Sequence, residues 1–72
     1  MKAVAKYDMT FNQGSFKRGK SYSFNISEMA YPIAKNDFTI EDIYVVTTEE
    51  NKKQDFTKQE FGLFFRLEKK GA

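Results

Sequence analysis

The side chains that could do chemistry in this chain are carboxylates, hydroxyls and amines, because its 72 residues include no histidine and no cysteine. Nucleophilic catalysis would need a serine, threonine or lysine activated by a neighbour, and imidazole or thiolate zinc sites are excluded. Two acid pairs, Glu41–Asp42 and Glu49–Glu50, are adjacent in the sequence, but adjacent residues of a strand point to opposite faces. The residues thus predict a protein that is not an enzyme and that holds no metal and no cofactor.

The basic residues favour a binding function. Lys17, Arg18 and Lys20 form a basic turn between Phe16 and Tyr22. Phosphate contacts need such a cluster, and exposed aromatic rings can stack on single-stranded bases. The same lysines would equally keep a solvated edge of a sheet soluble while the rings enter the core. Because the net charge is only +2, nucleic-acid binding is the second interpretation.

Charge is unevenly distributed along the chain. Residues 27–51 carry six acids and one lysine, a net charge of −5, whereas the segments on either side are basic. A domain with separate acidic and basic surfaces suits protein recognition, since complementary fields steer the encounter. The acids of this segment are Glu28, Asp37, Glu41, Asp42, Glu49 and Glu50.

An apolar cluster lies within the same acidic segment. It consists of Met29, Tyr31, Pro32 and Ile33. If these side chains are exposed, they form a candidate protein-contact patch. If they are buried, they cap the core, and the sequence leaves both interpretations open.

The length predicts one small domain over residues 1–72. Its eight phenylalanines and four tyrosines predict an aromatic core, because each ring buries about 150–250 Å². No apolar run reaches the roughly 20 residues of a membrane-spanning helix, and the first residues, MKAVAKYD, lack the apolar region of a signal peptide. With no cysteine, these features predict a cytoplasmic protein that does not enter the membrane.

Alternating side chains predict mostly β-strands. Residues 27–42 are the hardest to assign, because Pro32 disfavours a central strand, and an irregular or edge segment is expected there. Residues 11–20 are expected to be loop and turn. Strands are expected over residues 3–9, 21–26 and 43–48, in a short return at 53–56, and in a last strand with Phe65 and Leu67 facing inward.

One helical turn is predicted before the last strand. Thr57 as N-cap and Glu60 three residues later form a capping box, with Phe56 and Phe61 as the accompanying hydrophobic staple. Gly62 weakens a helix by about 1 kcal/mol, so the helix should be short, covering roughly Lys58 to Phe64.

This order of five strands, with a helical turn between the fourth and fifth, resembles an SH3-like barrel. The stretches AKYD at residues 5–8 and SFKRGKSYSF at 15–24 look like the "ALYDY" and "LSFKKGD" elements at the start of SH3 domains. The tryptophan pair and the "GxxPxNY" element of the polyproline groove are missing, and only Tyr7 matches that surface. The resemblance implies a five-stranded barrel without a polyproline site.

In such a barrel the first and last strands are neighbours, which would extend the basic turn into a larger basic face. The residues of this candidate basic face are Lys2, Lys6, Lys17, Arg18, Lys20, Arg66, Lys69 and Lys70.

The preferred interpretation is a small non-enzymatic module that binds another protein. A tiny, cysteine-free, aromatic-rich chain resembles accessory proteins of bacteria and their phages, which often bind and inhibit a host protein. The alternatives are nucleic-acid binding through the basic face and a homodimer formed through an edge strand.

Overall fold

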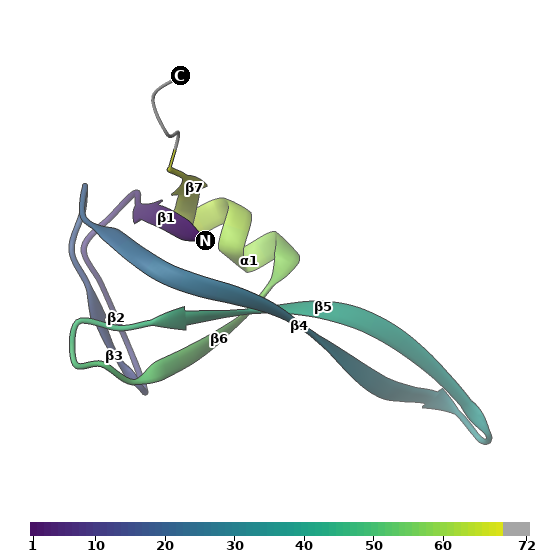
Figure 1. Cartoon of the computed structure of the whole chain (residues 1–72). Helices are drawn as coiled ribbons and strands as arrows, with labels where there is room; N and C mark the ends of the chain where they lie inside the picture. The colour runs from purple at the N-terminus through teal and green to yellow at the C-terminus, as the bar shows by residue number, and fades with distance from the viewer. Residues whose placement is uncertain (69–72) are drawn as a thin grey trace.

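The chain folds into two antiparallel sheets and one short helix in the computed structural model, which describes residues 1–68 (Figure 1). This confirms the expected mainly β fold with a single helical segment. In chain order the elements are β1 (Lys2–Ala5), β2 (Met9–Phe11), β3 (Gly14–Phe16), β4 (Ser21–Ala34), β5 (Asp37–Thr47), β6 (Lys53–Thr57), α1 (Lys58–Phe64) and β7 (Phe65–Leu67).

The larger sheet has five strands in the order β6-β5-β4-β1-β7, and β2 and β3 form a separate hairpin. The first and last strands are neighbours, as expected, since Ala3 pairs with Tyr22 of β4 on one side and with Leu67 of β7 on the other. The edge strands β6 and β7 do not pair with each other, so no closed barrel is found over residues 1–68.

Aromatic rings build the core. Phe16 meets Tyr22 and Phe65 with its ring nearly perpendicular to theirs, at centroid distances of 4.9 and 5.1 Å. Phe61 of α1 stacks on Tyr44 of β5 at 4.4 Å. Edge-to-face and offset-stacked pairs are the favoured aromatic geometries, and they let a few large side chains fill a thin domain.

The helix covers the residues predicted for it, Lys58–Phe64, and begins at the predicted capping box. The Thr57 hydroxyl accepts a hydrogen bond from the Glu60 amide at 3.1 Å, and the Glu60 carboxylate accepts one from the Thr57 amide at 2.9 Å. Both bonds satisfy amides that the first turn leaves free. They also fix the point at which the chain leaves the sheet, because Thr57 is the last residue of β6 and pairs with Ile43.

The N-terminal strand is shorter than expected. β1 ends at Ala5, Met9 begins a separate strand, and residues 11–16, expected as loop and turn, belong to the β2–β3 hairpin. Gly14 makes this hairpin possible, because it has a φ of +143° and a Cβ there would lie 2.5 Å from the Thr48 hydroxyl. Close packing of the hairpin against the β5–β6 turn therefore needs a residue without a side chain.

The inward orientation predicted for Leu67 is wrong. Phe65 is buried, but the Leu67 side chain is 64% exposed. β7 is an edge strand, and its aromatic neighbours Phe16, Phe56 and Phe61 pack on Phe65 at the start of the strand. Leu67 lies two residues further on, at the open margin of the core.

The expected irregular segment is instead a regular two-stranded ribbon. β4 and β5 pair from Phe24–Val46 out to Ala34–Asp37, with one irregularity between Pro32 and Ala34. Asn36, with a φ of 64°, closes the turn. Pro32 is tolerated because each strand of a two-stranded ribbon has an outer side where no amide donor is needed.

This ribbon projects from the rest of the molecule. β1 pairs with β4 only over residues 21–23, and β6 pairs with β5 only over residues 43–47. Beyond those positions the two strands have only each other, and they extend to the right in Figure 1, where the molecule is elongated to 44 Å. Residues 27–42 are called the arm below, and residues 1–26 and 43–68 are called the body.

Candidate protein-binding arm

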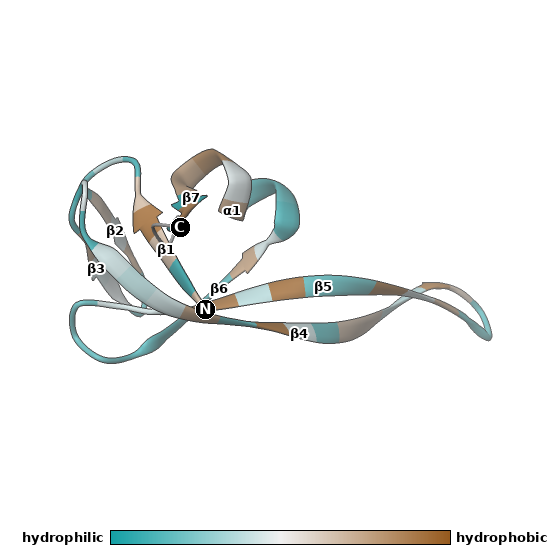
Figure 2. Cartoon of the chain, turned by 45° about the horizontal axis from the view of Figure 1, so that its top comes forward, coloured by the Kyte–Doolittle hydropathy of each residue, from teal (hydrophilic) through white to brown (hydrophobic). Residues whose placement is uncertain are grey.

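One face of the arm is largely apolar. Directly paired residues of antiparallel strands share a face, and the pairs Ala30–Ile40 and Pro32–Phe38 follow one another by alternation. Phe38 is 63% and Ile40 67% exposed. These four residues are called the apolar face, and Figure 2 shows hydrophobic and hydrophilic stretches alternating along both strands of the arm.

The contact patch expected from the sequence is divided between the two sides of the arm. Met29 and Tyr31 pair with Glu41 and Thr39 on the side opposite the apolar face, and the Tyr31 hydroxyl lies 3.6 Å from the Met29 sulfur. Pro32 belongs to the apolar face, and Ile33 lies at the irregularity. All are exposed except the half-buried Tyr31, so they do not cap the core. Their contact with a partner stays a prediction.

Sequence reasoning missed the most exposed ring of the arm. Phe38 and Ile40 alternate with Asp37, Thr39 and Glu41, which is the period of a half-polar strand. That signal was available, but it is interpretable only once the preceding segment, with its proline, is recognised as the partner strand.

The predicted acidic surface is also divided. Four of its acids lie on the arm, where Glu28 is directly opposite Asp42. With Lys35 as the arm's only basic residue, residues 27–42 have a net charge of −3. Like charges opposite each other on a sheet destabilise it slightly, so Glu28 and Asp42 do not stabilise the arm.

The other two acids, Glu49 and Glu50, hold the body together. Glu49 forms an ion pair with Lys20 at 2.8 Å. Glu50 accepts hydrogen bonds from the Ser15 amide at 2.7 Å and the Ser15 hydroxyl at 2.8 Å. The bond from Lys20 lowers the pKa of Glu49, and the bonds from Ser15 lower the pKa of Glu50. These carboxylates attach the β3 side of the body to the β5–β6 turn.

Several residues of the predicted basic face lie on or beside β1. The Gly19 amide bonds to the Ala5 carbonyl at 2.9 Å, which places the basic turn beside the end of β1. Lys2 and Arg66 lie on β1 and on the neighbouring β7.

Two of its amines are already engaged, because Lys20 pairs with Glu49 and the Lys6 amine donates to the Gly62 carbonyl at 2.9 Å. Lys69 and Lys70 lie outside the described residues.

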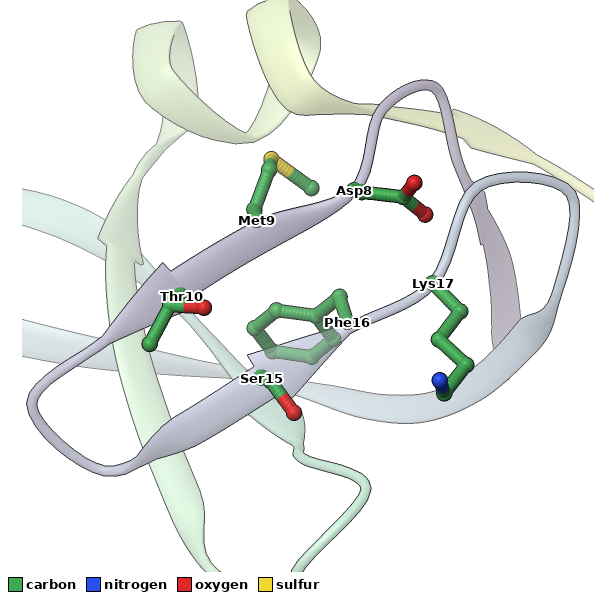
Figure 3. Close-up of a pocket in the computed structure, with 6 residues that line it drawn as sticks. All are labelled: Asp8, Met9, Thr10, Ser15, Phe16 and Lys17. Atoms are coloured by element: carbon green, nitrogen blue, oxygen red, sulfur yellow. The ribbon is translucent and has the colours of Figure 1, made fainter.

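A shallow cavity of about 360 Å³ lies between the β2–β3 hairpin and the basic turn (Figure 3). Two of its polar side chains are bonded within the chain: Asp8 accepts from the Arg18 amide at 2.8 Å, and the Ser15 hydroxyl is bonded to Glu50. These two bonds connect the lining of the cavity to the basic turn and to the β5–β6 turn.

Over residues 1–68, no cluster of acidic, histidine or cysteine side chains is suited to hold a metal ion. The same residues contain no helix with the length and hydrophobicity needed to cross a membrane. Comparisons of the chain with protein-family models, curated proteins and solved structures found no match.

Proposed function

We propose that the protein is a non-enzymatic module that binds another protein through its arm. The observation that carries this proposal is the exposure of Phe38 and Ile40 on a ribbon that adds nothing to the core. Burying apolar surface contributes roughly 25 cal/mol per Å², so a partner surface that covers both side chains would gain substantially. Aromatic and large aliphatic residues within a charged rim are the usual centre of a protein–protein interface.

The geometry of the arm supports the same function. A two-stranded ribbon is marginally stable alone in water, and here its base is fixed by β1, β6 and the aromatic core. The arm is therefore presented in one direction without the body having to approach the partner. Such preorganisation lowers the entropic cost of association.

The SH3-like resemblance enters this proposal at the level of fold. The adjacency of β1 and β7 and the position of α1 before the last strand support it. In such a barrel the arm would be an enlarged connection between the second and third strands. More specifically, the protein has an accessory or inhibitory role toward a bacterial or host protein.

A pull-down from nuclease-treated bacterial lysate tests the proposal. We compare the wild-type chain with Phe38→Ser and with a matched control, Leu63→Ser, which replaces an exposed apolar residue of α1. We expect one protein to be retained by the wild type and by Leu63→Ser and to be lost with Phe38→Ser. Equal retention by all three chains, or no retained protein, would contradict a binding role for the arm.

Nucleic-acid binding is the second candidate, favoured by the position of Lys2, Arg66 and the basic turn around β1. It predicts affinity that falls steeply with salt and with the change Arg18→Glu. When the same pull-down is repeated without nuclease, recovery that is seen only in the untreated lysate would favour this candidate over the arm.

A further inference from the structure

The outer edge of β5 is unpaired along the arm. β4 pairs with one side of β5 throughout, but β6 covers the other side only from Ile43 to Thr47, because the chain leaves the sheet at Thr57 to begin α1. The backbone amides and carbonyls that face outward between Asp37 and Asp42 therefore have no strand partner within residues 1–68. An unpaired edge of this length is a template for an added strand.

The outer edge of β4 in the arm is a poorer template for an added strand than the edge of β5. Pro32 lacks the amide that a neighbouring strand would need, and the pairing is irregular between Pro32 and Ala34. Both features are typical of edges that resist pairing. The segment DFTIED of β5 has neither feature, so a strand can add to one side of the arm but not equally to the other.

The side chains along this edge specify what the added strand should contain. Phe38 and Ile40 belong to the apolar face, whereas Asp37, Thr39 and Glu41 point to the opposite side. A strand beside β5 would place every second residue next to Phe38 and Ile40. Its remaining residues would lie next to Asp37 and Glu41, where lysine or arginine would form cross-strand ion pairs.

A second copy of the chain does not meet this requirement. Directly opposite residues of an antiparallel pair share a face, so the two registers that pair most of this segment with itself are centred on Thr39 and on Ile40. The register centred on Thr39 sets Asp37 opposite Glu41 twice by symmetry, and like charges directly opposite each other are unfavourable. The register centred on Ile40 sets Glu41 opposite Thr39. Neither register gives Asp37 or Glu41 a basic partner, whereas a basic edge does.

We propose that the β5 edge of the arm binds an extended segment of another protein in which basic residues alternate with apolar residues. This inference rests on the proposed function, and it names the kind of segment that the arm recognises. Main-chain hydrogen bonds to β5 hold the segment, and the alternation of Asp37, Phe38, Thr39, Ile40 and Glu41 selects its sequence.

Fluorescence anisotropy of labelled short peptides with the full chain tests this inference. The probe peptide alternates lysine with valine, and a control peptide has the same composition in two blocks. We expect the alternating peptide to bind at least about tenfold more tightly. Equal binding of the two peptides, or no binding of the alternating one, would overturn the inference.

Methylated peptides test the main-chain contacts. In a strand, alternate amides point to the same side. N-methylation of one alternate set should therefore abolish binding, and N-methylation of the other set should leave it nearly unchanged. Equal effects of the two sets would show that the peptide does not add to the sheet.

A charge-matched pair of variants tests whether the peptide binds at the β5 edge. Glu41→Lys changes the β5 edge, and Glu28→Lys makes the same change on β4, with circular dichroism confirming that both fold. We expect Glu41→Lys to lower the affinity for the alternating peptide by about tenfold and Glu28→Lys to lower it by less than about threefold. An equal loss of affinity in both variants would show that the acidic arm attracts the basic peptide without binding it along β5. If a protein from the lysate is retained only when Phe38 is present, while no peptide binds, the proposed function stands and the inference of strand addition to β5 fails.

Discussion

The body and the arm use the same two strands in opposite ways. In the body, seven of the eight phenylalanines and Tyr22 and Tyr44 pack against one another. In the arm, the remaining phenylalanine, Phe38, is 63% exposed. β4 and β5 run through both regions without interruption, so the difference arises from neighbouring elements rather than from the type of secondary structure.

The comparison shows how one small domain separates stability from recognition. Where β1, β6 and α1 flank the two strands, the apolar side chains form the core. Where those elements end, the same alternation presents apolar and acidic side chains to solvent. A partner can then cover the arm without any change to the core, and substitutions in the two regions should have separable effects.

The largest expected effect comes from the same substitution made in each region. Phe24→Ala in the body should lower the free energy of unfolding by about 3–5 kcal/mol, because Phe24 is fully buried and contacts Phe61. A domain of this size has only about 5 kcal/mol in total, so the variant should be largely unfolded. Phe38→Ala should change stability by less than about 0.5 kcal/mol.

Urea denaturation followed by circular dichroism measures both variants. Phe24→Leu serves as an intermediate that keeps most of the core filled and should remain folded. A stable Phe24→Ala protein, or a Phe38→Ala protein that unfolds, would remove the distinction between the two regions.

Glycine substitutions sharpen the comparison within the body. Gly14→Ala should destabilise the protein by about 2–3 kcal/mol, because its Cβ would collide with Thr48 and Glu50 and its φ is +143°. Gly62→Ala is the control, since nothing lies within 4 Å of the added carbon on the helix. It should stabilise by up to about 1 kcal/mol. We expect the two variants to shift the denaturation midpoint in opposite directions. A Gly14→Ala protein as stable as the wild type would show that the hairpin does not need the close contact.

The body was more predictable from sequence than the arm, for local reasons. The capping box at Thr57 and Glu60 fixed the helix because its signal lies within a few residues. The core strand around Phe24 follows from its alternation, and the one around Val46 follows from its run of β-branched and aromatic residues. The β2–β3 hairpin was missed because the requirement for Gly14 comes from Thr48 and Glu50, which are distant in the sequence.

The arm was missed for a different reason. Pro32 argues against a strand in any local interpretation, and its cost disappears only because the ribbon leaves one side of β4 free. The exposure of Phe38 depends on where β6 turns away from β5 at Thr57. Neither fact can be obtained from the residues of the arm alone, so its role as a candidate site required the topology.

A smaller effect is expected at high pH, and only in the body. Burial raises the pKa of Tyr22 to about 12, and the nearby Glu49 carboxylate acts in the same direction. Because the folded-state pKa lies above the unfolded value, the contribution of Tyr22 is complete below about pH 10 and is lost as the pH rises through 12. The expected loss is about 1–2 kcal/mol.

Tyr22→Phe isolates this effect from the titration of lysines. It removes the hydroxyl that accepts from the Lys17 amide, so it should be less stable than the wild type at neutral pH by about 1 kcal/mol. The difference between the two proteins should shrink above pH 10. Urea midpoints measured across this range check the prediction, and a constant difference would show that Tyr22 ionises as it does in the unfolded chain.

The largest change to the chain should have only a small effect on stability. Replacing residues 28–42 with a short turn containing Asn-Gly removes most of the arm but keeps the buried Ile43 and every contact of β1 and β6. We expect the free energy of unfolding to change by less than about 1 kcal/mol, since the distal part of a two-stranded ribbon adds little. The same chain should lose its protein partner completely. If it unfolds, the arm belongs to the folding unit and the division into two regions is wrong. If it folds and still retains the partner, recognition lies in the body, and the basic face around β1 becomes the surface to mutate.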